Sequence, residues 1–407
     1  MKRVVISGAG IYSTIGNNLE SVAGSLYKGQ SGIGIDPRRK EFGFRSSLSG
    51  IIERPNLKGL LSRRERVGLP EQGEYAYVAT MEALANAKID MDFLLGNEVG
   101  ILYGNDSSSV PVIEAIDIMR ERRDTSLIGS GSIFQSMNST ISMNLSVILK
   151  LRGINLTISG ACASSSHAIG LAYMLISGGF QDVIICGGGQ EINAESMGSF
   201  DGLSAFSVRE DKPSAASRPF DRDRDGLVPS GGAATVIVES LESAQKRGAK
   251  ILGEIKGYGF SSNGAHISVP NVEGPMVSLL KALKAANMKP SDIDYINAHA
   301  TSTPVGDLNE GKALLEVFGD CNTLVSSTKA MTGHEMWMGG ASEVIYSLLM
   351  MERSFIAPNI NFNAPDDELG RLNVVPETKE CNLDTILSNS FGFGGTNSTL
   401  IISKYRK

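Results

Sequence analysis

Short apolar segments alternate with helical segments along the chain, and most apolar segments end in a loop rich in glycine, serine and threonine. Up to residue 250, the apolar runs predict strands at residues 3–7, 98–103, 154–158, 182–186 and 233–238. After that point, the same pattern predicts strands at residues 251–258, 293–298, 323–327, 385–389 and 398–403. Strands that alternate with helices are typical of a layered α/β protein.

The second half of the chain resembles the first. The corresponding segments are residues 99–103 and 294–298, residues 156–162 and 324–330, and residues 182–189 and 385–392. The second pair is followed in each half by a helix of small residues, at 164–177 and 339–352. Internal repetition predicts two similar halves, 1–250 and 251–407, although two ordinary α/β domains would also fit. The stretch 200–230 is rich in Ser, Pro, Arg and Asp, so we expect an irregular excursion there but no flexible linker.

Composition narrows the class of protein. The 407 residues are 42% hydrophobic and 20% charged, which describes a globular protein with a sizeable core. A net charge of −6 argues against a general nucleic-acid or membrane-surface role but permits local basic patches. The four cysteines have no metal-like spacing and no disulfide density, which favours a reducing compartment. The basic and then apolar residues 1–8 are too short for a signal peptide and predict a first strand ended by turn residues from Gly8 to Gly16, so we expect a cytoplasmic protein.

Cys162 is the first candidate for chemistry. It lies between the strand predicted at 154–158 and the helix predicted at 164–177, among small residues that leave room for a substrate. The N-terminus of a helix offers the positive end of the macrodipole and unpaired N–H groups, and both favour the nucleophilic thiolate. A free cysteine is also often a small buried hydrophobe, so this position alone does not decide the matter.

Two of the four histidines end strand patterns in loops rich in turn residues. His299 follows the strand predicted at 293–298, and His334 follows the one at 323–327. The carboxyl end of a strand is where α/β folds usually place catalytic groups. His167 is expected to pack inside a helix, and no role is assigned to His266.

Metal and dinucleotide sites are weaker alternatives. His334-Glu335 could begin a zinc motif, but the second histidine would fall at Met338, so we expect no metal. The run Ser7-Gly8-Ala9-Gly10 follows the first predicted strand, but Ser13 occupies the third glycine position and no acidic residue ends a clear second strand. We therefore interpret this loop as structural, and we expect no cofactor.

Four motifs together resemble the β-ketoacyl-ACP synthases, over essentially the whole chain. They are Gly-Ala-Cys-Ala-Ser-Ser at 160–165, His-Ala-Thr-Ser-Thr-Pro-Val-Gly-Asp at 299–307, Lys-Ala-Met-Thr-Gly-His at 329–334 and Ser-Asn-Ser-Phe-Gly-Phe-Gly-Gly-Thr-Asn at 388–397. The run Ser-Gly-Gly-Ala at 230–233 is more similar to the synthase I branch than to synthase II. The resemblance implies a thiolase fold, with two βαβαβαββ halves in five α-β-α-β-α layers, usually as a homodimer.

The resemblance also implies an activity. Cys162 would accept an acyl group from acyl-ACP as a thioester, and His299 and His334 would assist decarboxylation of malonyl-ACP. The carbanion would then attack the thioester to give 3-oxoacyl-ACP and CO2, as in fatty acid elongation. Two imidazole N–H donors suit the negative charge that develops on the malonyl thioester oxygen, and the acyl-enzyme divides one difficult condensation into two steps.

Further residues take roles by resemblance. The oxyanion hole would use the N–H groups of Cys162 and Phe393, and Phe393 would also act as a gate. The remaining expected roles are catalytic or supporting for Lys329, Glu343 and Asp307, pantetheine binding for Thr301 and Thr303, and docking of acidic carrier protein for Arg63, Arg64, Arg66, Arg120 and Arg123. Ordinary solvated helix faces are the alternative for these arginines.

Three positions depart from the family pattern. Ala300 stands where the family usually has glycine after the histidine, which would be costly if that position needs a positive φ. Residues 335–338, Glu-Met-Trp-Met, replace small and aliphatic residues, and residues 105–109, Asn-Asp-Ser-Ser-Ser, replace a run of small, glycine-rich ones. These changes leave the condensing residues intact. They predict a reshaped acyl pocket, with a polyene or aryl-capped chain as one possible occupant.

Other members of the superfamily differ at identifiable positions. A thiolase would carry a second catalytic cysteine in the C-terminal loop, and Cys381 lies too far upstream. Priming and chalcone-type enzymes use Cys-His-Asn, whereas His334 is the third group here, and a chain-length factor would lack Cys162. A ketosynthase subunit of a type II polyketide or aryl-polyene pathway, paired with a chain-length factor, stays open as the alternative.

Overall fold

Ten strands form one mixed sheet in the computed structural model, which describes residues 1–319 and 321–407, in the order β10-β9-β13-β14-β8-β1-β7-β6-β4-β5. The strands from the first half of the chain are β1 (Val4–Ser13), β4 (Val99–Gly104), β5 (Asn155–Ile158), β6 (Val183–Gln190) and β7 (Gly232–Ser240). Those from the second half are β8 (Gly253–Ser262), β9 (Tyr295–Asn297), β10 (Leu324–Ser326), β13 (Thr385–Gly392) and β14 (Thr396–Ser403). All ten expected strands are therefore present.

The two halves of this sheet have the same strand order, counted outward from the antiparallel pair β1 and β8 at its centre. The segments that correspond in sequence occupy equivalent places: β4 and β9, β5 and β10, and β6 and β13. Two small antiparallel sheets lie outside it, formed by β2 (Ile33–Ile35) with β3 (Leu48–Gly50) and by β11 (Phe355–Ile356) with β12 (Lys379–Glu380). The pattern of apolar runs thus predicts the positions of the ten strands of the main sheet but not the strands of these two small sheets.

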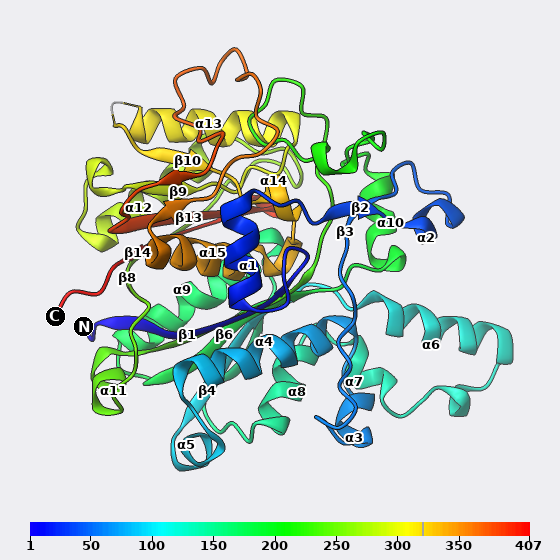
Figure 1. Cartoon of the computed structure of the whole chain (residues 1–407). Helices are drawn as coiled ribbons and strands as arrows, with labels where there is room; N and C mark the ends of the chain where they lie inside the picture. Colours follow the sequence, from blue (N-terminus) through cyan, green and yellow to red (C-terminus); the bar gives the residue numbers. More distant parts are fainter. Residues whose placement is uncertain (320) are drawn as a thin grey trace.

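Helices form three layers around the two halves of the sheet (Figure 1). The central helices are α9 (Ser164–Ser177) and α15 (Gly339–Arg353), and α15 is buried from Gly339 to Met351. The outer layers contain α4 (Glu71–Ala87) and α8 (Thr140–Ile148) on one side and α12 (Glu273–Ala286) and α13 (Pro304–Phe318) on the other. The other helices are α1 (Leu19–Lys28), α2 (Pro37–Glu41), α3 (Arg63–Val67), α5 (Met91–Gly96), α6 (Ser109–Arg122), α7 (Ser132–Ser136), α10 (Ala194–Gly202), α11 (Leu241–Lys246) and α14 (Lys329–Thr332).

The central helices approach each other closely at their N-terminal ends. A Cβ atom on Gly340 would lie 2.5 Å from the side chain of Ser166, so only glycine fits at this crossing. The backbone N–H of Ala341 donates a hydrogen bond to Oγ of Ser165 at 3.0 Å. Small residues at the start of both helices thus bring together the turns that precede them.

The first strand is longer than the sequence predicted. The expected strand ended at residue 7, before turn residues between Gly8 and Gly16, whereas β1 continues to Ser13. A Cβ on Gly10 would lie 2.1 Å from the carbonyl oxygen of Ala79 in α4, so this glycine allows the helix to lie directly on the strand. The glycines that suggested a turn or a phosphate loop are needed for this close packing.

The excursion between α10 and β7 is irregular, as expected, apart from one 3-10 turn at Pro213–Ala215. It is anchored by the buried carboxylate of Asp221, which pairs with Arg218 at 2.9 Å and accepts the N–H groups of Asp223, Asn363 and Ala364. The segment is therefore a fixed part of the structure. None of the helices described is long and apolar enough to cross a membrane.

Candidate active site

Cys162 lies in a 3-10 turn, Ala161–Ala163, between the end of β5 and the start of α9. Ala161 has a φ of +46°, in the left-handed region that alanine rarely adopts. Its N–H donates a hydrogen bond to Oδ2 of Asp106 at 3.0 Å, which holds the strained turn from the neighbouring loop. The sulfur atom therefore projects from a sharp, fixed turn.

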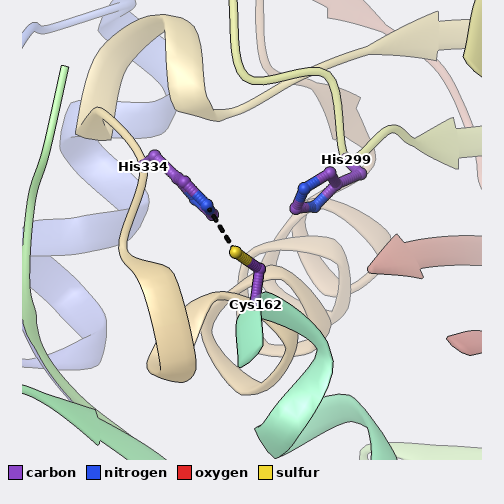
Figure 2. A group of neighbouring side chains, drawn as sticks. All are labelled: Cys162, His299 and His334. Atoms are coloured by element: carbon purple, nitrogen blue, oxygen red, sulfur yellow. Dashed lines mark hydrogen bonds between the residues drawn. The ribbon is translucent and has the colours of Figure 1, made fainter. Parts of the chain in front are cut away.

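His299 and His334 point toward this sulfur from two other segments (Figure 2). Nε2 of His334 lies 3.1 Å from Sγ of Cys162, and the centroids of the two imidazole rings are 5.3 Å apart, with the rings nearly perpendicular. His299 follows β9, and His334 follows α14, just beyond β10. The structure thus brings together the three residues that the sequence placed at strand ends.

Burial changes the expected ionisation of the cysteine. The position at a helix N-terminus favoured a thiolate, but burial raises the pKa of Cys162 to about 12, against the opposing effects of Lys329 and of the N–H groups of Cys162 and Phe393. The expectation of a thiolate is therefore wrong for the free protein, because desolvation outweighs these favourable interactions. The thiol proton instead faces His334.

Both active-site histidines are neutral. Burial holds the pKa of His299 and of His334 well below the usual value, and the positive charge of Lys329 lowers both further. A neutral imidazole has one N–H donor and one acceptor nitrogen. The pair can therefore accept a proton from sulfur or donate hydrogen bonds to a developing oxyanion.

The positive charge near the site comes from Lys329, which is buried and forms an ion pair with Glu343 in α15. Burial raises the pKa of Glu343 to about 8, and Lys329 acts in the opposite direction. Because the carboxyl partner lies on the central helix, the pair joins the loop of His334 to the core. The resemblance had implied catalytic or supporting roles for both residues.

The loop that carries His299 is held by a carboxylate that the sequence analysis missed. Glu310 in α13 accepts the N–H groups of His299 and Ala300 at 2.9 and 2.6 Å, and burial raises its pKa to about 7. Ala300 does not have a positive φ, so alanine carries no conformational cost there. The sequence signal that could have identified Glu310 is its position three residues after Asp307, which places both carboxylates on the same face of the helix.

Asp307 and the two threonines fix the next turn. Asp307 is buried and accepts the N–H of Phe220 at 2.9 Å, and burial raises its pKa to about 6 while the N–H groups of Thr301 and Ser302 lower it. Oγ1 of Thr301 and Oγ1 of Thr303 lie 3.1 Å apart. Both threonines line the cavity that leads to Cys162.

That cavity has a volume of about 410 Å³ and reaches Cys162, His299 and His334. Phe393, which is 39% exposed, lines it next to Gly394 and Gly395, both with positive φ. His266 also lines it, although the sequence assigned it no role, and its Nδ1 accepts the N–H groups of Ser268 and Val269. His167 lies outside the cavity, packed in α9 between Tyr258 and Thr396 as expected.

The same three residues are also the described group whose spacing could hold a metal ion. The sulfur and imidazole nitrogens of Cys162, His299 and His334 lie within 4.8 Å of one another. Two neutral imidazoles and a thiol also form the donor and acceptor set that acyl transfer needs. The geometry therefore fits both a metal site and acyl-transfer chemistry without a metal.

The basic residues expected to dock a carrier protein lie away from this group. Arg63 and Arg64 are exposed on α3, and Arg66 is half-buried. Arg120 and Arg123 are exposed at the end of α6. Figure 1 shows α3, α6 and α7 together at the end of the molecule away from both termini.

Comparison with known proteins identifies a family. Residues 1–244 match the N-terminal domain of beta-ketoacyl synthases, and residues 252–363 match the C-terminal domain. A 3-oxoacyl-[acyl-carrier-protein] synthase 1 from Haemophilus influenzae is 42% identical over 408 residues, with all of both chains covered. A beta-ketoacyl synthase from Burkholderia phymatum superimposes with a TM-score of 0.94 at 34% identity over all of both chains. A ketosynthase in complex with its type II polyketide acyl-carrier protein has a TM-score of 0.90 at 28% identity and covers 99% of this chain and all of that one.

The raised pKa of Cys162 predicts a specific pH dependence of alkylation. Because the thiol pKa of about 12 lies above the working range, the thiolate fraction should rise about tenfold per pH unit between pH 7 and 9. Iodoacetamide labelling of the peptide that contains Cys162, followed by mass spectrometry, should show this rise without a plateau. A labelling rate that is already constant near pH 7 would mean that a thiolate–imidazolium pair forms with His334.

Proposed function

The chain belongs to the beta-ketoacyl synthase family, and on that premise we propose that it condenses an acyl group held on Cys162 with malonyl-ACP in fatty acid elongation. The products are 3-oxoacyl-ACP, free carrier protein and CO2. The observation that carries this proposal is the group of one thiol and two neutral imidazoles at the end of a 410 Å³ cavity, with Cys162 and His334 buried and His299 half-buried. Such a group can bind an acyl chain covalently and then stabilise an enolate next to it.

In the first step, Sγ of Cys162 attacks the thioester carbon of acyl-ACP. The thiol proton passes to Nε2 of His334, which lies 3.1 Å away, and from there to the departing thiolate of the carrier's pantetheine arm. The N–H groups of Cys162 and Phe393 face the sulfur and would stabilise the oxyanion of the tetrahedral intermediate. An acyl thioester on Cys162 and a free carrier thiol result.

In the second step, the bond between the malonyl carboxylate and its neighbouring carbon breaks and releases CO2. The electron pair moves onto the thioester oxygen, where the N–H of His299 stabilises the enolate. His334 adds a second donor in the tautomer that carries its single proton on Nε2. The carbanion carbon then attacks the acyl carbon and expels the sulfur of Cys162, which takes up one proton from water. Both histidines are neutral before this step, so a hydrogen bond from either N–H to the enolate does not require a positively charged imidazole.

The surrounding residues position this chemistry. Lys329 and Glu343 hold the loop of His334, and Glu310 holds the loop of His299. Asp307 fixes the turn of Thr301 and Thr303, which would bind the pantetheine arm. Phe393, next to two glycines with positive φ, would open and close the acyl side of the cavity.

Variants of the three central residues should separate the two steps. Intact mass after incubation with acyl-ACP should show one acyl adduct, which Cys162→Ala removes and Cys381→Ala retains. His299→Ala should still acylate but lose decarboxylation of malonyl-ACP by about 10²–10³-fold, since one oxyanion donor is missing. EDTA should change neither step. No adduct from any acyl donor would contradict the proposed function.

The second candidate function differs from the first in the acyl chain that Cys162 would carry. In this alternative, the protein is a ketosynthase subunit of a type II polyketide or aryl-polyene pathway. The rings of Phe200 and Phe206 stack 6.3 Å apart, and Phe200 also stacks on Phe393 at 6.1 Å. Flat aromatic walls of this kind suit conjugated chains. Acylation by unsaturated or aryl donors alone, in the mass assay above, would favour this second function.

An acidic carrier protein would dock on the arginines of α3 and α6, here defined as Arg63, Arg64, Arg66, Arg120 and Arg123. Two observations support this: they are mostly exposed, and α3 and α6 lie at the same end of the molecule. Glu65 sits among them, within the capping box of α3.

Reversing two of these charges should weaken carrier binding. Arg63→Glu with Arg66→Glu should raise KM for acyl-ACP about tenfold, because electrostatic attraction is lost at the docking site. Activity toward acyl-pantetheine, which has no carrier surface, should stay unchanged. The matched control reverses two exposed lysines elsewhere, Lys246→Glu with Lys284→Glu. If KM for acyl-ACP rises equally in both double variants, the carrier protein docks at another surface.

We also infer a homodimer. Strand β5 forms one edge of the main sheet, and its Leu156 is 47% exposed. Val147, on the neighbouring helix α8, is also largely exposed. An apolar, unpaired edge strand is suited to pairing with the same strand of a second copy. Sedimentation equilibrium should give twice the chain mass, and Leu156→Lys should shift it toward the monomer. A monomeric wild-type protein would overturn this inference.

Two expectations from the sequence remain proposals. The division into halves at 1–250 and 251–407 is supported by the order of strands on each side of β1 and β8. The cytoplasmic location stays a prediction.

A further inference from the structure

Trp337, the only tryptophan of the chain, lies three residues after His334 in the 3-10 turn Met336–Met338. Its side chain is 7% exposed and belongs to the apolar cluster that contains Cys162, Met197 and Phe206. The indole ring lies 6.2 Å from the ring of Phe200. A large, rigid side chain thus belongs to the same apolar cluster as the reacting cysteine.

A chain of hydrogen bonds holds the indole ring in place. Nε1 of Trp337 donates to Oγ of Ser107 at 3.1 Å, and this hydroxyl donates to Oε1 of Glu191 at 3.1 Å. Glu191 is almost completely buried, and the same oxygen accepts the N–H of Ser109 at 2.8 Å. The ring therefore has one fixed orientation, set by the polar loop of residues 105–109.

The same loop also contacts the nucleophile turn. Asp106 accepts the N–H of Ala161, and its neighbour Ser107 accepts the N–H of Trp337. Residues 105–109 and residues 335–338 are two of the three places where the sequence analysis expected a departure from the family pattern. The structure places them against each other, beside Cys162, so the two departures form one feature.

This feature bounds the space that an acyl chain can use. The apolar residues that line the cavity at Cys162 include Phe200, Leu203, Leu227 and Met336. Among the described residues, neither Trp337 nor any member of the 105–109 loop lines it. Trp337 therefore stands outside the lining itself, next to two residues that form it: its ring lies beside that of Phe200, and Met336 precedes it in the chain.

We propose that Trp337, oriented by Ser107, is the specificity-determining residue that limits the depth of the acyl pocket and restricts Cys162 to short acyl groups. This inference rests on the proposed function, because it needs acylation of Cys162. A short chain ends within the cavity, whereas a longer saturated chain would have to displace the indole ring or extend into solvent over Leu203, which is 54% exposed. Replacing the indole with a smaller group would open a space beside Cys162.

The test compares acylation rates of Cys162 by butyryl-, hexanoyl-, decanoyl- and dodecanoyl-ACP, followed by intact mass. The wild type should react with butyryl-ACP at least about tenfold faster than with decanoyl-ACP, a discrimination that a hydrophobic pocket can supply. Trp337→Gly should remove this preference by accelerating the decanoyl reaction, with the butyryl rate little changed. Trp337→Phe keeps most of the ring and should retain the preference, and Ser107→Ala should reduce it partly.

Several outcomes would overturn the proposal. One is a preference of the wild type for decanoyl- or dodecanoyl-ACP. Another is a ratio of butyryl to decanoyl acylation rates in Trp337→Gly that equals the wild-type ratio. If that variant does not fold, Trp337→Leu gives the same comparison with a smaller cavity, and labelling of Cys162 by iodoacetamide reports whether the turn is intact. No acylation of the wild type by any donor would instead contradict the proposed function, so the two failures are distinguishable.

Discussion

The close packing of α9 against α15 is the constraint on which the active site depends. Each helix begins directly after a turn that carries a reactive group, Cys162 before α9 and His334 before the turn that leads into α15. Because Gly340 meets Ser166 where no Cβ would fit, the two helix starts approach closely enough to place Nε2 3.1 Å from Sγ. Both helices are buried between the halves of the sheet, so neither turn can move without disturbing the core.

Burial then determines the charges. Removing water raises the pKa of Cys162 and lowers that of both histidines, which leaves the thiol and the two imidazoles beside it neutral. The ion pair of Lys329 with Glu343 places a positive charge near Cys162 without contacting the sulfur. A site of this kind does not hold a permanent thiolate. It holds a proton that can move and donors that already face the place where negative charge would develop.

The sequence predicted the strands, the repetition and the three central residues, because apolar runs and strand-end loops are local features. It missed contacts that depend on how distant segments meet. In the sequence, Glu310 is indistinguishable from other acidic residues on a helix, yet in the structure it accepts hydrogen bonds from the backbone of the His299 loop. The glycines of β1 read as turn residues, and only the position of α4 shows why they lie inside a strand. The expectation that Cys162 is a thiolate was wrong for the same reason, since burial is a property of the whole fold.

The mirrored strand order has a consequence for how the two halves share their work. The turn after β5 carries Cys162, and the turn after β10, which occupies the equivalent place in the second half, carries Lys329 and leads to His334. Equivalent places in the two halves of the sheet therefore carry a thiol on one side and an amine with an imidazole on the other. Because Cys162 and His334 come from different halves, neither half alone contains the group that meets in the cavity, and its geometry depends on how the two halves pack together.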